Sequence, residues 1–389
     1  MIVDADTHNY AIEIYKDFEV ENFYHLIKNT LDPQYDLDAK WESMYNQVRA
    51  PDWPDSGTRE DFHKLPLFIR QELKNDHKFE LTHISDDLES IHLDDVNHYY
   101  PSLDCQAKSG PAFCKTDKQV ILPETNRSIL DYSHNRELAV KLMKHYNQKM
   151  LQVCKQNPGF DFAIWLAMQD IDACLEELHN YVNEDFFGVI VDDGMPWAMI
   201  PTAFPVFEFC AKHKIPVYFH TNVSRPPPDR LVWDFNNPTY IKLKSNWPFP
   251  PQPTSKSNAW KINIVTLITE KMFERLPDLR VIFSEKGLHW IPKIREYMLS
   301  QGWEDPLPYY QKHFWITTDY EEPDFLKNSN LLGWDRLLFS TDYPHNDPGG
   351  TNRFNDVDLL QALLNNGDIT QDQYDQLTHQ NYQLLKSRK

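Results

Sequence analysis

The stretch RLLFSTDYPH, residues 336–345, begins as a buried strand and ends in polar side chains. Its apolar part, with Leu337, Leu338 and Phe339, fits the interior of a sheet, and Asp342 and His345 follow it. A carboxylate at the end of a buried strand is costly unless a positive group or hydrogen-bond donors meet it. Asp342 is therefore either a capping or salt-bridged acid, or a member of a metal or catalytic site.

The stretch is the last of eight similar runs. Each run is short and rich in β-branched or aromatic residues, and most are followed by a longer stretch with helical periodicity, which is typical of parallel βα units. Eight such units in 389 residues predict an α/β fold, a (β/α)8 TIM barrel in one domain over residues 1–389. The predicted strands are 2–8, 119–123, 161–168, 188–193, 215–220, 280–285, 314–319 and 336–342.

Helices are predicted in the gaps between these strands, where apolar residues recur three and four positions apart. Two segments are longer than ordinary loops. Residues 11–118, after the first strand, are predicted to form an insertion that caps the barrel, and the proline-rich residues 221–258, after the fifth strand, are predicted to form a lid loop. The predicted helices are 135–156, 170–182, 202–214, 259–276, 291–302 and 370–385.

Composition excludes several classes of function. The net charge is -19 and no basic block occurs, so we expect no nucleic-acid binding. No apolar stretch approaches the roughly 20 residues that span a bilayer, and the first residues, MIVDADTHNY, lack the pattern of a signal peptide. We therefore expect no membrane association and a cytoplasmic location. The five cysteines form no CxxC pair, which argues against a thiolate zinc site.

Potential metal ligands stand where the predicted strands end. In a TIM barrel the active site lies at the carboxyl ends of the strands. Asp6 and His8 are two positions apart on the first strand, so they point to one face, while His220 ends the fifth strand and Asp342 the eighth. Two nitrogen and two oxygen donors suit Zn²⁺ or Mn²⁺. We therefore predict one divalent metal ion at this end of the barrel.

Five motifs resemble the amidohydrolase superfamily, in the branch of aminocarboxymuconate-semialdehyde decarboxylase. The motifs are DADTH (4–8), YFHTN (218–222), PDLRVIFSEKGLHWIP (277–292), RLLFSTDYPH (336–345) and QNYQLL (380–385). The resemblance implies a barrel with one metal ion held by Asp6, His8, His220 and Asp342, with Asp342 also transferring a proton. It also implies a homodimer. A second, bridged ion is not expected because no lysine ends the fourth strand, although Asp192 could replace it.

The chain departs from this pattern at two positions. Many members have a histidine where Asp6 stands, and many decarboxylases have a histidine where Glu285 ends the sixth strand. Glu285 is predicted to be a catalytic acid, with helix capping as the alternative. His345, Trp290 and Arg225 are predicted to bind substrate, with ordinary structural roles as the alternatives.

The predicted reaction therefore has two forms. As a decarboxylase, the protein would remove carbon dioxide from a small carboxylate; as a hydrolase, it would use a metal-bound hydroxide against a small amide or lactone. A different class is a partner-binding or peptide-processing barrel of a biosynthetic pathway, with residues 11–118 as the recognition surface.

Overall fold

The computed structural model describes most of the barrel. The described residues are 1–9, 114–123, 136–192, 197–220, 259–318, 322, 324–343 and 356–388. The predicted lid at 221–258 lies wholly outside them, and the predicted cap at 11–118 lies outside them except for its last five residues.

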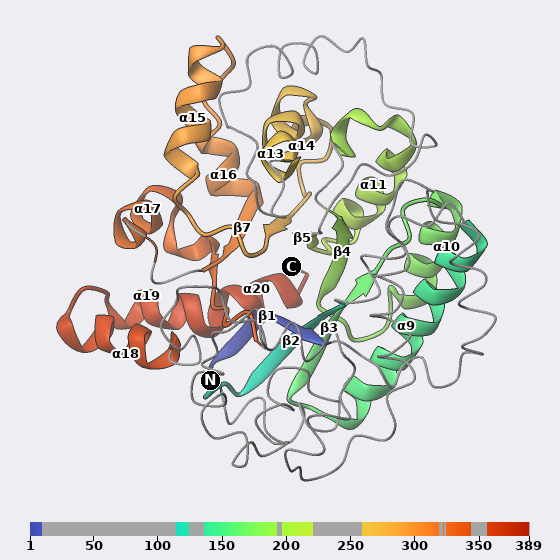
Figure 1. Cartoon of the computed structure of the whole chain (residues 1–389), viewed down its shortest axis with the longest axis horizontal. Coiled ribbons are helices and arrows are strands. Elements are labelled where there is room, and N and C mark those ends of the chain that lie inside the picture. The colour runs from blue at the N-terminus through green and yellow to red at the C-terminus, as the bar shows by residue number, and fades with distance from the viewer. Residues whose placement is uncertain are drawn as a thin grey trace, which may run out of the picture.

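Eight parallel strands form one sheet in the order of the sequence, each paired with the next. This arrangement confirms the predicted TIM barrel (Figure 1). The strands are β1 (Val3–Asn9), β2 (Lys118–Pro123), β3 (Phe160–Trp165), β4 (Gly188–Asp192), β5 (Val217–His220), β6 (Val281–Phe283), β7 (Phe314–Thr317) and β8 (Leu337–Leu338).

The first strand and the segment after β8 lie together and close the ring. The backbone N–H of Ala5 donates to the carbonyl of Phe339 at 2.9 Å, and Thr7 forms a parallel bridge with Tyr343. Strand β8 is shorter than the predicted 336–342. The backbone of Asp342 has a φ of 55°, in the left-handed region, so the extended conformation cannot continue through it.

Helices surround the strands (Figure 1). Four predicted helices occur close to their predicted ranges, as α9 (Arg136–Gln156), α10 (Ile171–Tyr181), α11 (Phe204–Lys212) and α15 (Ile291–Ser300). The predicted helix at 259–276 is two helices, α13 (Ala259–Thr269) and α14 (Met272–Arg275), because Lys271 has a φ of 60° and breaks it.

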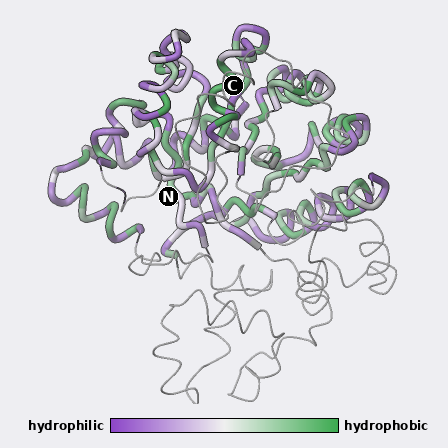
Figure 2. The backbone as a smooth tube through the Cα atoms, turned by 45° about the horizontal axis from the view of Figure 1, so that its top comes forward, coloured by the Kyte–Doolittle hydropathy of each residue, from purple (hydrophilic) through white to green (hydrophobic). Residues whose placement is uncertain are grey.

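The predicted last helix, 370–385, is also divided. It consists of α19 (Gln371–Asp375), a π-helical turn (Gln376–Gln380) and α20 (Asn381–Lys386). Within the described ranges, three α-helices were not predicted, namely α16 (Leu307–His313), α17 (Phe325–Leu332) and α18 (Asp356–Asn366). Along the helices, hydrophobic and hydrophilic residues alternate, as expected where one side faces the strands (Figure 2).

The C-terminal helix is attached to the amino end of the barrel. Asp161, near the start of β3, is almost fully buried and accepts hydrogen bonds from Tyr382 Oη and Lys386 Nζ, both at 2.6 Å. Both donors belong to α20. Inside the barrel, Tyr218 Oη donates to the carbonyl of Ala5 at 2.7 Å, from β5 to β1. The cluster of Asp6, His8, His220 and Glu285 lies at the opposite end of the barrel, where the strands finish.

Candidate metal and active site

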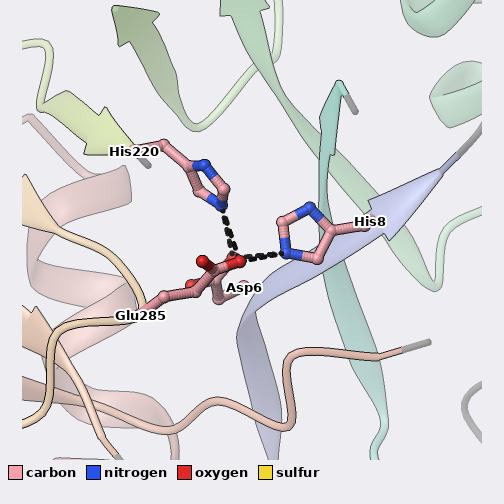
Figure 3. A group of neighbouring side chains, drawn as sticks. All are labelled: Asp6, His8, His220 and Glu285. Carbon is pink, nitrogen blue, oxygen red and sulfur yellow. Dashed lines mark ion pairs between the residues drawn. The ribbon is translucent and has the colours of Figure 1, made fainter. Parts of the chain in front are cut away.

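Strand β1 places Asp6 and His8 inside the carboxyl end of the barrel, where both are fully buried. His220 ends β5 on another part of the ring and is 1% exposed. The two imidazole rings meet edge to face, with their centroids 4.9 Å apart. The side chains of Asp6, His8, His220 and Glu285 point toward one another (Figure 3). The predicted convergence of β1 and β5 at one point is thus present.

Asp6 presents one carboxylate oxygen to both histidines. Its Oδ1 lies 3.4 Å from Nε2 of His8 and 3.9 Å from Nε2 of His220. Its Oδ2 accepts a hydrogen bond from Thr317 Oγ1 at 3.2 Å, which fixes the orientation of the carboxylate. Among the described residues, Oδ1 accepts no hydrogen bond. An oxygen that is buried, aimed at two imidazole nitrogens and left without a donor is suited to bind a cation.

Glu285 also belongs to this group. Its Oε1 lies 3.1 Å from Nε2 of His8 and 3.1 Å from Nε2 of His220. The backbone of Glu285 has a φ of 55°, and its N–H donates to Thr317 Oγ1 at 3.0 Å. Thr317, at the end of β7, therefore links Asp6 to Glu285. The sequence indicated an acid at this strand end but gave no sign that it would contact both histidines.

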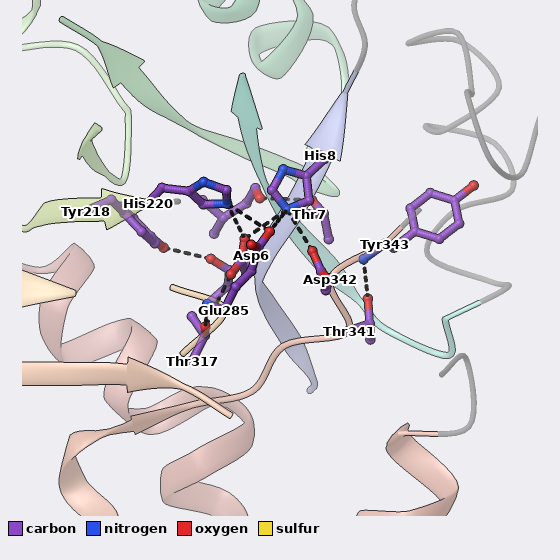
Figure 4. Close-up of polar contacts among 12 residues, drawn as sticks. Asp6, Thr7, His8, Tyr218, His220, Glu285, Thr317, Thr341, Asp342 and Tyr343 are labelled. Atoms are coloured by element: carbon purple, nitrogen blue, oxygen red, sulfur yellow. Dashed lines mark hydrogen bonds and ion pairs between the residues drawn. The ribbon is translucent and has the colours of Figure 1, made fainter. Parts of the chain in front are cut away.

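Asp342 approaches the group from the segment after β8. Its Oδ1 lies 2.9 Å from Nε2 of His8, and its backbone N–H donates to the carbonyl of Asp6 at 3.1 Å (Figure 4). Three carboxylates therefore surround two imidazoles in a buried space. Such a concentration of negative charge is expensive unless a cation compensates it.

The geometry fits a single divalent ion. One donor atom from each of Asp6, His8, His220 and Glu285 lies within 4.8 Å of all the others. Ligand atoms about 2.1 Å from one ion are at most about 4.2 Å apart, so shifts of a few tenths of an ångström bring these four donors to an ion. Imidazole nitrogens with carboxylate oxygens are a donor set for Zn²⁺ or Mn²⁺.

A further buried carboxyl group, which the sequence did not single out, lies beneath this group. Asp4 is fully buried on β1, and burial raises its pKa to about 8 against the lowering effect of hydrogen bonds from Thr341 and from the backbone of Asp6. Its contacts link β1 to the segment that carries Asp342. Only the alternating acids of DADTH could have indicated it.

Comparison with known proteins identifies the family. The amidohydrolase family model matches residues 125–381, more than half of the chain. The chain belongs to the amidohydrolase family. The predicted resemblance, and with it the prediction of a metal-dependent enzyme, is confirmed. The matched residues include His220, Glu285 and Asp342, whereas Asp6 and His8 precede them.

Two relatives of this amidohydrolase are decarboxylases. Gamma-resorcylate decarboxylase of a Rhizobium species is 23% identical over 254 residues, which cover 59% of this chain and 73% of the relative. The 2-amino-3-carboxymuconate-6-semialdehyde decarboxylase of Dictyostelium discoideum is 24% identical over 261 residues, which cover 59% of this chain and 67% of the relative.

A solved structure has the same fold. The 5-carboxyvanillate decarboxylase of Novosphingobium aromaticivorans, with bound manganese and 3-methoxy-4-hydroxy-5-nitrobenzoic acid, matches with a TM-score of 0.64 at 15% identity, covering 100% of this chain and 97% of the other. That structure contains manganese and a small aromatic acid. The comparisons give no support to the alternative prediction of a partner-binding or peptide-processing barrel.

The three predicted substrate-binding residues have different outcomes. His345 and Arg225 lie outside the described residues. Trp290 is 1% exposed, its Nε1–H donates to the carbonyl of Gly287 at 2.8 Å, and its ring packs edge to face against Trp260 and Tyr310. These contacts favour the structural alternative for Trp290, and its substrate role stays a prediction. Among the described helices, none is long and apolar enough to cross a membrane.

Proposed function

We propose that this amidohydrolase is a manganese-dependent decarboxylase of a small carboxylate that carries an oxygen substituent beside its carboxyl group. The observation that supports it most is the meeting of two imidazoles and three carboxylates at the carboxyl end of the barrel. Relatives named as decarboxylases, and a neighbouring structure that contains manganese, support the reaction and the metal.

In this proposal Asp6, His8, His220 and Glu285 hold the ion, and Asp342 is a further donor from the segment after β8. Glu285 is thereby assigned to the metal instead of to the predicted acid role, because its Oε1 lies 3.1 Å from both histidine nitrogens. When bound, the ion supplies the positive charge that chelates the substrate oxygens and stabilises negative charge developing on them.

Asp342 supplies the proton. As a carboxylic acid, it donates its proton to the carbon that bears the substrate carboxylate, and the bond to the carboxyl carbon then breaks. The electron pair of that bond stays with the substrate carbon, carbon dioxide leaves, and Asp342 regains a proton from water. The side chains beside Asp342 are shielded from bulk solvent, since Asp6, His8 and His220 are each at most 1% exposed.

The test is a substrate panel assayed with manganese-loaded protein. Gamma-resorcylate, 5-carboxyvanillate and dienoic acids form one arm, and small amides and lactones form the other. Release of carbon dioxide from the acids, abolished in Asp342→Asn, is the expected result. Cleavage of an amide or lactone without carbon dioxide would instead establish the hydrolase. No turnover in either arm contradicts the proposal.

Several predictions from the sequence remain part of this proposal. On the sequence alone we propose that residues 11–118 form a cap within a single domain and that Arg225, His345 and Trp290 bind substrate. We also propose on the sequence alone that the protein is a homodimer with a cytoplasmic location. Sedimentation of the purified protein tests the dimer. Substitution of Arg225 by Lys or of His345 by Asn, each expected to raise KM more than it lowers kcat, tests the substrate contacts.

A further inference from the structure

Asp4 forms hydrogen bonds to two separate parts of the site. Its Oδ1 accepts from the backbone N–H of Asp6 at 3.3 Å and from the backbone N–H of Thr341 at 3.1 Å. Its Oδ2 accepts from Thr341 Oγ1 at 2.5 Å. One buried carboxyl group therefore contacts the strand that carries Asp6 and His8 and also the residue directly before Asp342.

The segment around Asp342 needs such support. Asp342 has a left-handed backbone, with a φ of 55°, which is unfavourable for a residue other than glycine. The residues on either side of Asp342 are both held by β1. Thr341 is held through its hydrogen bonds to Asp4, and Tyr343 is held through its carbonyl, which accepts from the N–H of His8 at 2.6 Å. Thr341 Oγ1 also accepts from the N–H of Tyr343 at 3.3 Å, so it joins both flanks (Figure 4).

We infer that Asp4 and Thr341 together are positioning residues that set the distance between the carboxylate of Asp342 and the Asp6–His8 pair. The Thr341 hydroxyl is central because it donates to Asp4 and accepts from the backbone after Asp342. Loss of this hydroxyl lets Asp342 relax from its left-handed conformation and moves its carboxylate away from His8. Groups that orient metal ligands without touching the metal typically contribute 10–100-fold to affinity or activity.

The inference rests on the proposed metal site, and the test measures Mn²⁺ binding as well as turnover. Mn²⁺ affinity is measured by calorimetry on the metal-stripped full chain of the wild type and of the Thr341→Val, Thr341→Ser and Thr266→Val variants. Thr266→Val is the control, because Thr266 is also fully buried and donates its hydroxyl to a carbonyl, that of Ile262 within the same helix, α13, which carries none of the proposed ligands.

Thr341→Val is expected to bind Mn²⁺ about 10–100-fold more weakly, whereas Thr341→Ser and Thr266→Val keep the wild-type affinity. Asp4→Asn gives the same test should Thr341→Val not fold. Wild-type affinity in Thr341→Val, or an equal loss in Thr341→Ser, overturns the inference. If the wild type itself binds no Mn²⁺, the metal site and the inference both fail; if it binds Mn²⁺ but releases no carbon dioxide, only the proposed reaction fails.

Discussion

Oδ1 of Asp342 lies 2.9 Å from Nε2 of His8, across the line where the last strand of the barrel meets the first. This contact joins the two ends of the sheet, because β1 and the segment after β8 are hydrogen-bonded neighbours. The contact places Asp342, the proposed proton donor, directly beside the imidazole of His8, a proposed metal ligand. Chemistry and barrel closure therefore depend on the same few residues.

Asp342→Asn is expected to lower turnover by about 10²–10⁴-fold, the usual contribution of a positioned proton donor, because an amide cannot supply the proton. Under saturating Mn²⁺ the variant should still bind about one ion per chain, since Asp6, His8, His220 and Glu285 remain. Turnover and metal content are measured on the same samples. Asp368→Asn, at an exposed position after α18, is the control. Activity within tenfold of the wild type would rule out Asp342 as the proton donor.

Removal of the metal should affect stability as well as turnover. A chelator is expected to remove about one divalent ion per chain, abolish turnover and lower the melting temperature, because the ion compensates the charge of three clustered carboxylates. Restored Mn²⁺ at about 100 times its dissociation constant should stabilise the fold by about 2.7 kcal/mol. Scanning calorimetry and elemental analysis measure both effects. Full activity in metal-free protein would contradict the metal site.

The barrel was predictable from the sequence because strands buried on both sides read as continuous apolar runs. VYFH in β5 and FWIT in β7 are such runs, and both are fully buried. The break at Lys271 was not predictable, because AWKINIVTLITEKMFERL keeps its apolar spacing through the position where the backbone becomes left-handed. Periodicity records which side is buried and contains no information on a single reversed φ angle.

The site was predictable to the extent that it follows from strand ends. Asp6, His8 and His220 are buried inside the barrel, as alternation along a strand predicts, and their role as metal ligands stays a prediction. The contact of Glu285 with both histidines could not be derived, because Glu285 follows β6 with a positive φ and alternation no longer applies there. The pairing of Asp4 with Thr341 joins residues 337 positions apart and depends on closure of the barrel.

Gly287 controls the loop that follows Glu285. Gly287 has a φ of +56°, and a Cβ added there would lie 2.5 Å from Oε2 of Glu322, whose carboxylate accepts from the N–H groups of Leu288 and His289. Gly287→Ala should therefore lower the free energy of unfolding by about 1–2 kcal/mol through backbone strain, and by a further amount because the new methyl group displaces Glu322. It should also weaken Mn²⁺ binding, because the strained loop follows Glu285. Urea unfolding and calorimetry measure these losses.

Gly302 provides the matched control for this substitution. Its φ is +75°, and a Cβ added there meets nothing within 4 Å, so Gly302→Ala should lose only the backbone contribution and keep the Mn²⁺ affinity of the wild type. The comparison separates backbone strain from the effect on Glu322. Equal losses of stability and metal affinity in the two variants would show that the contact with Glu322 has no part in the site.

His313 should make stability depend on pH. Burial lowers the pKa of His313, whose ring stacks on Phe273 and whose Nδ1 lies 2.9 Å from the carbonyl of Leu279. Below about pH 6.5 this histidine binds a proton more readily in the unfolded chain than in the folded protein. The neutral ring therefore contributes to the stability of the fold above that pH, and this stability is lost as the pH falls, by at most about 1.4 kcal/mol per pH unit. Between pH 7.5 and pH 5.5, urea unfolding should show a smaller decrease in the free energy of unfolding for His313→Phe than for the wild type. The control is His179→Phe, at an exposed position of α10, which should show the same decrease as the wild type. The same pH dependence in all three proteins would mean that the His313 ring is protonated equally well in the folded and unfolded chains.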